Sequence, residues 1–334
     1  MRQITVAVTS GDPCGVGPEV ILKAFAASSR RPQVHLVVVG DLPVFQRIAT
    51  RLHRRLPPWQ VVPSWDLQRV GSGPLTFLDC GHTTSFIPGS TSQTAGRAAL
   101  DYLAIAVALW KAKRLQALVT GPVTKWAIAR VLPGFTGQTE YLARALGVRR
   151  EVVMLFVSDR LRVALLTRHV ALSRVPRAMT KTRLHQSIRL TAQGLTAHFG
   201  IARPRLALCG LNPHAGEASR TSEERAVMQP VLRTLGRAGI RCEGPFAADG
   251  LFARRTREYD AVICAYHDQG LIPFKMAARD RGCQLSVGLP LVRTSPDHGS
   301  ALDIAGRGIA EPGSMRYALN LAIRLARRHP SGPC

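Results

Sequence analysis

Short apolar runs alternate along the chain with longer segments of helical character. Seven apolar runs are expected to form strands, at residues 4–8, 34–39, 115–120, 152–157, 162–167, 205–210 and 260–266. Between several of them lie segments that suit helices, such as TAGRAALDYLAIAVALWKAK and LHQSIRLTAQGLTAHFG. Strands that alternate with helices are typical of a largely parallel sheet. We therefore expect an α/β fold, in which the loop-rich stretch 52–66 is the most irregular part.

Four of these apolar runs end in a short polar cluster. The clusters are GPVTK, RHV, LNPHAGE and HDQG, and the last three contain His169, His214 and His267. In open α/β sheets the carboxyl ends of the strands line the ligand crevice, so these histidines are candidates for one site. Three neutral imidazoles can hold a divalent metal. The alternative is that each histidine is separately hydrogen-bonded in a loop or helix start, and no HExxH signature decides between the two.

The stretch TSGDPCGVGPEV, residues 9–20, follows the first apolar run and precedes a segment that can form a helix. Asp41 follows the next apolar run. Together these features imitate a dinucleotide-binding fingerprint, although the spacing GxxxGxG differs from GxGxxG. The residues alone leave open whether this loop binds a dinucleotide.

The composition is that of a globular protein. The chain has 334 residues, 46% hydrophobic and 20% charged, which is enough for two domains or one large one. No apolar run approaches the roughly 18 residues of a membrane helix, and the N-terminus lacks a secretory pattern. A cytoplasmic location without a membrane partner is therefore expected. The seven cysteines are scattered without a CxxC pair, which favours reduced thiols over a zinc site.

The net charge of +24 is unusual, and arginine supplies 39 of the 45 basic residues. A clustered basic face is typical of nucleic-acid binding. Here the arginines are spread along the whole chain in ones and twos. This favours a solvated surface that attracts anionic small molecules, and the alternative of a nucleic-acid-binding protein rests on charge alone.

Seven sequence blocks carry a resemblance to a known family. They are GDPCGVGPE, VTGPVTK, GFTGQTEYLA, LTRHVALSRVP, GLNPHAGE, AYHDQGLIPFK and GLPLVRTSPDHGSALDIAGRG. Their order and spacing resemble those of the 4-hydroxythreonine-4-phosphate dehydrogenase family of vitamin B6 biosynthesis. The resemblance implies two α/β/α domains with a cleft between them, like isocitrate and isopropylmalate dehydrogenases and unlike a standard Rossmann domain. We expect residues 1–135 with 300–334 to form the first domain, and residues 136–299 to form the second, which carries most metal and substrate residues and the dimer interface.

The resemblance also implies a reaction. Family members oxidise the secondary alcohol of 4-phosphooxy-L-threonine with NAD or NADP, and the resulting 3-oxo acid loses carbon dioxide to give 3-amino-2-oxopropyl phosphate. His169, His214 and His267 fall on the positions that bind a divalent metal (Zn, Mg or Co), which suits both steps. In the family the third histidine comes from the partner subunit, so a homodimer with shared active sites is expected.

The resemblance of individual sequence blocks also implies roles for further residues. Lys275 and Arg293 match substrate-contacting cations, which suit an anionic, phosphorylated substrate. Thr139 matches a substrate-contacting threonine. Asp249 and Asp268 are expected to act with Lys275 in catalysis, by orienting metal ligands or relaying a proton, although carboxylates near a helix start also serve as caps. No motif identifies the residues that contact the dinucleotide, and the glycines of residues 11–17 are expected to form a tight turn at the cleft, where Asp12 and Glu19 are structural or approach the ligand.

Two positions depart from the family pattern. Gln138 replaces the histidine of the usual GHTE block, and Gln284 replaces a substrate-contacting asparagine. Glutamine can donate a hydrogen bond to a phosphate oxygen but cannot become cationic. The exact substrate is therefore open, and the alternative is another hydroxy acid, such as a four-carbon sugar-acid phosphate or a cyclic dihydrodiol carboxylate.

Overall fold

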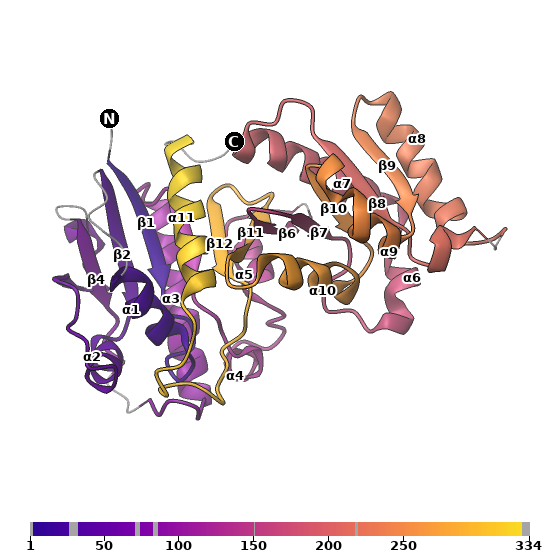
Figure 1. Ribbon diagram of the computed structural model, residues 1–334. Coiled ribbons are helices and arrows are strands. Elements are labelled where there is room, and N and C mark those ends of the chain that lie inside the picture. Colours follow the sequence, from indigo (N-terminus) through magenta and orange to yellow (C-terminus); the bar gives the residue numbers. More distant parts are fainter. Residues whose placement is uncertain are drawn as a thin grey trace. The chain divides into compact units, whose positions relative to one another are not determined.

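The computed structural model describes residues 3–26, 33–70, 74–82, 86–149, 151–217 and 220–328 (Figure 1). The chain divides into two compact units, which we call unit 1 (residues 1–148 and 289–334) and unit 2 (residues 149–288). These boundaries differ from the expected ones, because the segments 136–148 and 289–299 belong to unit 1. Both units combine strands with helices, which confirms the expected α/β class.

Unit 1 contains a parallel sheet with the strand order β3-β4-β2-β1-β5-β12. Its strands are β1 (Ile4–Thr9), β2 (Val34–Gly40), β3 (Gln60–Pro63), β4 (Leu75–Asp79), β5 (Ala117–Thr120) and β12 (Val292–Pro296). Its helices are α1 (Gly17–Ala26), α2 (Leu42–Arg51), α3 (Gln93–Lys111), α4 (Lys125–Ala129), α5 (Gln138–Ala145) and α11 (Gly313–Arg328). Helix α11 packs on β12, β5 and β1, and α3 packs on β1 and β2. Because its strands are parallel, their carboxyl ends share one edge of this sheet.

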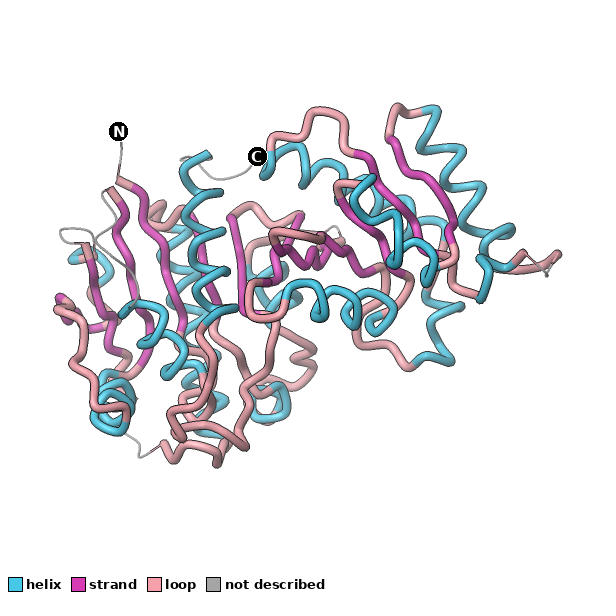
Figure 2. The backbone as a smooth tube through the Cα atoms, viewed as in Figure 1, coloured by secondary structure: helices cyan, strands magenta, loops and turns pink. Residues whose placement is uncertain are grey.

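Unit 2 contains strands in the order β11-β6-β7-β10-β8-β9. Figure 2 draws the strands of both units in magenta and the helices in cyan. They are β6 (Val153–Ser158), β7 (Arg162–Leu165), β8 (Arg205–Cys209), β9 (Arg241–Phe246), β10 (Ala261–Cys264) and β11 (Gly282–Val287). The pairs β11–β6 and β6–β7 are antiparallel, whereas β7, β10, β8 and β9 run parallel. The main helices are α6 (Val175–Ala178), α7 (Lys181–Phe199), α8 (Gln229–Arg237), α9 (Ala248–Gly250) and α10 (His267–Ala278).

Local sequence explains where the longest helices begin and end. The Ser92 hydroxyl accepts a hydrogen bond from the backbone N–H of Ala95 at the start of α3, and Thr180 does the same for Arg183 at the start of α7. Helix α7 ends at Gly200, whose φ of 74° lies in the left-handed region that glycine adopts without strain.

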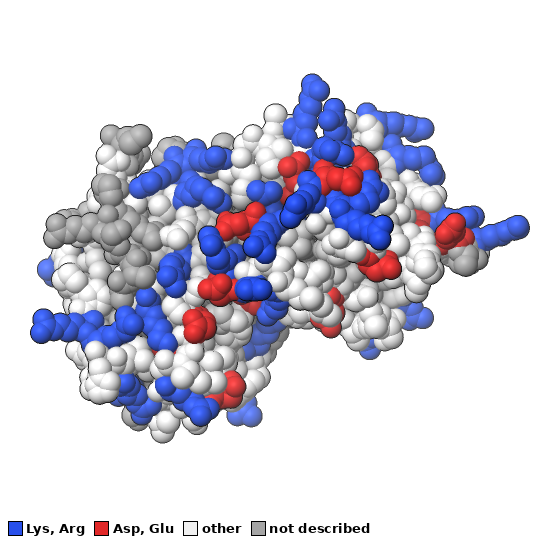
Figure 3. Space-filling view, in the orientation of Figure 1, with Lys and Arg blue, Asp and Glu red and all other residues white. Residues whose placement is uncertain are grey.

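All seven expected strands are present, which confirms the strand assignments from apolar runs. The stretch 52–66 is not wholly irregular, because it contains β3 at the edge of the sheet of unit 1. Within the described part of the chain, no helix is both long and apolar enough to cross a bilayer. Lys and Arg side chains are scattered over the face shown in Figure 3 and are interspersed with acidic residues.

Candidate active site

Three parallel strands of unit 2 are each followed by one of the candidate histidines. Strand β10 pairs with β7 on one side and with β8 on the other. His169 follows β7, His267 follows β10 and His214 follows β8. The carboxyl ends of these neighbouring strands lie at the same edge, so all three histidines follow strand ends at one edge of the sheet.

His169 and His267 lie side by side. Their ring centroids are 5.8 Å apart, with the ring planes inclined by 39°. The Nδ1 atom of His267 is 2.6 Å from Oδ1 of Asp268, a hydrogen bond that fixes the ring and leaves Nε2 available as a ligand atom. A carboxylate on the second nitrogen is typical of histidines that bind metals.

His214 lies on the loop that follows β8. It belongs to the short 3-10 helix Pro213–Gly216, where His214 and Ala215 have φ values of 51° and 52°. Non-glycine residues with positive φ are uncommon and persist where the surroundings hold them in place. Helix α9, which carries Asp249, contacts this segment. The structure thus brings Asp249 to the His214 loop, and it brings Asp268 to His267.

Glu224 holds the His214 loop and was not identified from the sequence. Its carboxylate is buried, with 1% of the residue exposed. Oε1 accepts hydrogen bonds from the backbone N–H groups of Leu211 (2.8 Å) and Asn212 (2.7 Å), and Oε2 accepts from the Asn212 side chain (3.0 Å). Burial by itself would raise the pKa of Glu224, but hydrogen bonds from Asn212, from its own backbone and from Ser222 together lower it.

Gln269 connects two of the strand ends and was also not identified. Its Oε1 accepts from the backbone N–H of Ala265 (2.7 Å), and its Nε2 donates to the carbonyl of Gly210 (2.7 Å). These bonds join the end of β10 to the end of β8, so Gln269 positions the segments that carry His267 and His214. Its place in HDQG, two residues after His267, is the only signal that the sequence offers for this role.

The imidazoles of His169, His214 and His267 have the chemistry of ligands for a divalent metal. They are only partly brought together in this chain. Among the residues that the structure describes, no group of three or more His, Cys, Asp or Glu side chains is arranged to hold a metal ion. Two imidazoles are adjacent, one of them oriented by a carboxylate, and the third lies on the loop after the neighbouring strand. Imidazole ligands with this kind of support suit zinc or another transition metal.

A buried arginine forms the centre of a polar cluster in unit 1. Arg293, on β12, is 3% exposed. Its guanidinium donates to the hydroxyl of Thr120 (2.6 and 3.2 Å) and to the hydroxyl of Thr139 (3.3 Å). Arginine stays protonated, so the cluster contains a permanent cation at the end of β5. Thr120, the last residue of β5, was not identified from the sequence.

Comparison with known proteins decides which family this architecture represents. The family model described as pyridoxal phosphate biosynthetic protein PdxA matches residues 32–322. The chain belongs to the PdxA family. A relative from Methylorubrum populi named 4-hydroxythreonine-4-phosphate dehydrogenase is 40% identical, over 97% of this chain and 95% of the relative. These matches confirm the resemblance seen in the sequence blocks.

Two solved structures show how far the likeness to PdxA proteins extends. The 4-hydroxythreonine-4-phosphate dehydrogenase from Klebsiella pneumoniae aligns with a TM-score of 0.83 and 31% identity, covering 97% of this chain and 100% of that one. A terephthalate 1,2-cis-dihydrodiol dehydrogenase from Burkholderia xenovorans aligns with a TM-score of 0.62 and 30% identity, covering 97% and 98%. Proteins named for different substrates therefore share this fold.

Gln138 and Gln284 are both held by hydrogen bonds. The Gln138 amide donates to the carbonyl of Gly121 (2.9 Å) and accepts from Arg293 (3.3 Å). Gln284 is buried on β11 and donates to the hydroxyl of Ser286 (3.0 Å). Gln138 thus belongs to the arginine cluster of unit 1, whereas Gln284 and the exposed Lys275 belong to unit 2.

The N-terminal glycine loop of this PdxA protein is shaped by close backbone packing. A Cβ on Gly11 would lie 2.3 Å from the carbonyl oxygen of Pro122, and one on Gly17 would lie 2.1 Å from that of Ser10. Asp12 accepts from the backbone N–H of Cys14 (2.9 Å) and from the Thr91 hydroxyl (2.7 Å). The glycines are required for a tight turn, which supports that interpretation over a dinucleotide fingerprint.

The two other acidic residues of the apparent fingerprint are buried inside unit 1. Glu19 pairs with Lys23 at 2.8 Å and accepts from the backbone N–H groups of Gly308 and Ala310. Asp41 accepts from the Tyr102 hydroxyl and from the backbone N–H of His82, and burial raises its pKa. In this structure both carboxylates tie segments of the fold together.

Proposed function

We propose that this protein oxidises 4-phosphooxy-L-threonine with NAD or NADP to the 3-oxo acid, which decarboxylates to 3-amino-2-oxopropyl phosphate. The observation that carries the proposal is the buried Arg293 cluster in a member of the PdxA family. A guanidinium already oriented by Thr120 and Thr139 can bind a phosphate or carboxylate with little loss of side-chain entropy. The net charge of +24 favours anionic substrates as well.

Each part of the site has a proposed task. Arg293, Thr139 and Gln138 bind an anionic group of the substrate, and Lys275 with Gln284 supplies further contacts. The cation of Lys275 also offsets negative charge that develops in the reaction. One of the carboxylates Asp249 and Asp268 accepts the hydroxyl proton, and Asp268 keeps the His267 ring oriented through its 2.6 Å hydrogen bond.

His169, His214 and His267 are the residues that would hold a divalent ion. When bound, such an ion supplies Lewis acidity to the alcohol oxygen and to the carbonyl formed from it. Removal of metal with a chelator should abolish NAD(P) reduction, and zinc, magnesium or cobalt should restore it. His214→Ala should lower the metal content of the purified protein while its thermal unfolding stays cooperative. Full turnover in a preparation shown to be metal-free would refute the metal dependence.

We also propose a homodimer with shared active sites. Helix α10 begins at His267 and exposes Ile272 and Met276, which are 59% and 76% accessible in the single chain. These residues are one helical turn apart, so they share a face of α10. An apolar face beside the candidate metal ligands suits an interface at which a partner's side chains reach the site.

Mixed dimers test whether the site is shared. One chain carries His169→Ala and the other His267→Ala, and both homodimers should be inactive. If His267 acts in the partner's site, one of the two sites in each mixed dimer is intact, and random assortment should restore about a quarter of wild-type activity. The 5.8 Å distance between the His169 and His267 rings would favour a site built within one chain. In that case mixed dimers, whose formation is verified by mass, should recover no activity.

Another hydroxy acid is the second candidate substrate, favoured by Gln138 in place of the family histidine. The discriminating experiment is a panel of 4-phosphooxy-L-threonine, a four-carbon sugar-acid phosphate and a cyclic dihydrodiol carboxylate. Each is assayed for NAD and NADP reduction with added divalent metal. The highest kcat/KM on 4-phosphooxy-L-threonine supports the proposal, and a value at least about tenfold higher on another compound would replace it.

A further inference from the structure

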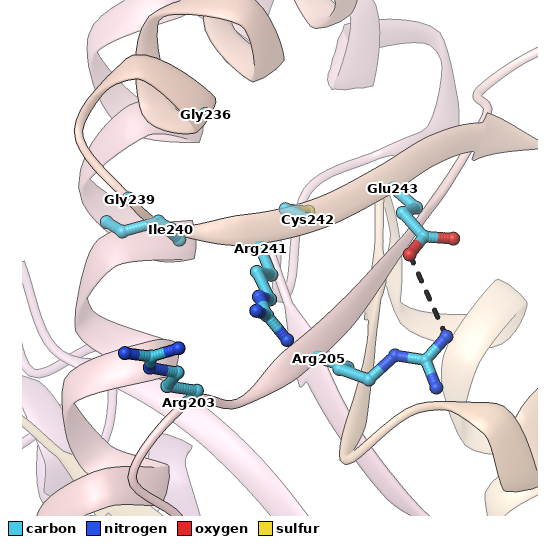
Figure 4. A pocket seen from close by; sticks show the side chains of 8 residues that line it. All are labelled: Arg203, Arg205, Gly236, Gly239, Ile240, Arg241, Cys242 and Glu243. Carbon is cyan, nitrogen blue, oxygen red and sulfur yellow. Dashed lines mark ion pairs between the residues drawn. The ribbon is translucent and has the colours of Figure 1, made fainter.

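Unit 2 contains an arginine-lined cavity that the proposed reaction does not use. Its volume is about 740 Å³, and it is lined by Arg203, Arg205, Gly236, Gly239, Ile240, Arg241, Cys242 and Glu243 (Figure 4). A neighbouring hollow of about 510 Å³ shares Arg203 and Arg241 with it and adds Arg189. The two hollows together are thus lined by four arginines of one unit.

This cavity lies away from the candidate active site. Arg205 is the first residue of β8 and Arg241 is the first residue of β9. His214 follows the opposite end of β8, beyond Cys209. At about 3.3 Å per residue, the four residue steps from Arg205 to Cys209 span roughly 13 Å. The cavity is therefore a separate site and not a lobe of the histidine cluster.

The two strand-starting arginines are direct neighbours in the sheet. Arg205 and Arg241 are register partners in the parallel pair β8–β9. Like charges on directly opposite residues of neighbouring strands destabilise the pairing. Figure 4 shows the Arg241 side chain extending toward the space beside Arg203 and Arg205. A bound anion would turn this repulsion into a favourable interaction.

The acidic groups near this cavity lie around Arg205, whose backbone N–H donates to Asp260 at 2.8 Å. Glu243 is the only acidic residue in the lining, and its Oε1 lies 3.8 Å from Arg205. Its other oxygen accepts from the Tyr259 hydroxyl at 2.7 Å, and the Arg205 guanidinium lies 5.5 Å from the Tyr259 ring centroid. Arg203 and Arg241 make no ion pair with any residue that the structure describes. At least two guanidinium groups are therefore available to a ligand.

We propose that this cavity binds a small anion that carries two or more phosphate groups. Its volume falls within the range of small-molecule sites, and planar guanidinium groups bind phosphate oxygens in pairs. The lining contains no aromatic residue on which a base could stack, which favours a compact polyphosphate over single-stranded nucleic acid. A Cβ added to Gly236 would meet no atom within 4 Å, so a side chain at this lining position has room.

Inorganic triphosphate is the probe, and isothermal titration calorimetry of the full chain at low ionic strength is the measurement. We expect saturable binding that Arg241→Gln weakens about tenfold, the effect of losing one charge-assisted contact. Arg237→Gln is the matched control, because Arg237 is exposed on α8 and does not line the cavity. Binding in this control should equal that of the wild type.

A second pair of variants separates loss of binding from loss of folding. Gly236→Glu places a carboxylate in the cavity and should abolish triphosphate binding, whereas Gly236→Ala adds only a methyl group and should bind normally. Arg293→Gln removes the guanidinium at the centre of the arginine cluster in unit 1. Triphosphate binding should persist when the titration is repeated with this variant. All variants are compared by thermal unfolding.

Four results would overturn the proposal. Equal weakening by Arg241→Gln and Arg237→Gln would mean general attraction by the net charge. Unchanged binding in Gly236→Glu, or loss of binding in Arg293→Gln, would place the triphosphate elsewhere. Tighter binding of a short DNA duplex than of triphosphate, sensitive to Arg241→Gln, would show that the surface serves nucleic acid.

Discussion

Replacement of Glu224 by glutamine should loosen the loop that carries His214. The wild-type carboxylate accepts from the backbone N–H groups of Leu211 and Asn212 with one oxygen and from the Asn212 side chain with the other. Gly216 permits this close approach, since a Cβ there would lie 2.4 Å from Oε2 of Glu224. Glutamine keeps the shape and one acceptor oxygen but turns the second acceptor into a donor and removes the charge.

The magnitude follows from the bonds that are lost. A hydrogen bond to a charged group contributes about 1.5–3 kcal/mol, and glutamine can still satisfy one backbone donor weakly, so the free energy of loop opening should fall by about 2 kcal/mol. Amide exchange in residues 210–217 then becomes about thirtyfold faster. The His214 imidazole is held less firmly, and the affinity for divalent metal should fall with it.

The pKa of Glu224 fixes the pH dependence of this effect. The folded pKa is depressed, so the contribution of the carboxylate is complete above the unfolded value, about 4.3, and is lost as the pH falls through the folded pKa. The difference in loop stability between wild type and Glu224→Gln should therefore be constant near neutral pH and shrink in acid.

Hydrogen exchange measured by mass spectrometry at pH 7 is the assay, with rates corrected for intrinsic exchange. Glu217→Gln is the matched control, because Glu217 is an exposed carboxylate on the same loop. Two results would refute the role of Glu224 in holding this loop. One is an acceleration of exchange in the 210–217 peptide of less than about threefold in Glu224→Gln, and the other is an equal acceleration in Glu217→Gln.

Three further outcomes are expected. Arg293→Gln should lower kcat/KM about 100-fold. Arg293→Lys keeps the charge but not the paired donors of the guanidinium, so its kcat/KM should fall less. Equal losses in the two variants would mean that the charge is irrelevant. Gln138→His should preserve or raise kcat/KM if the substrate is 4-phosphooxy-L-threonine, and lower kcat/KM if the true substrate is another compound. No change on either compound would mean that residue 138 does not determine substrate specificity. Met276→Asp should shift sedimentation from dimer to monomer, while Arg279→Asp, directly after the end of α10, should not. A Met276→Asp variant that remains dimeric would exclude α10 from the interface.

Much of the fold could be predicted from local pattern. The seven apolar runs became strands because continuous burial leaves a recognisable apolar segment, as in β2, which is buried at every position. Five strands were not expected: β3, β4, β9, β11 and β12. The segments of β9 and β11, RCEGPF and GCQLSV, mix polar residues and glycine with apolar ones. In β11 the whole strand is nevertheless buried, so its burial comes from neighbouring elements and not from its own composition.

The sequence by itself determined the family, the α/β class and the placement of the three histidines after strands, because each of these depends on residues that are close together in the chain. Only the tertiary structure decided that β10 lies between β7 and β8, which sets His267 beside His169. It also decided that Glu224 and Gln269 hold the strand ends in place. Such hydrogen bonds join residues that are distant in the chain or on separate loops, and the geometry that makes them exists only after the strands have paired.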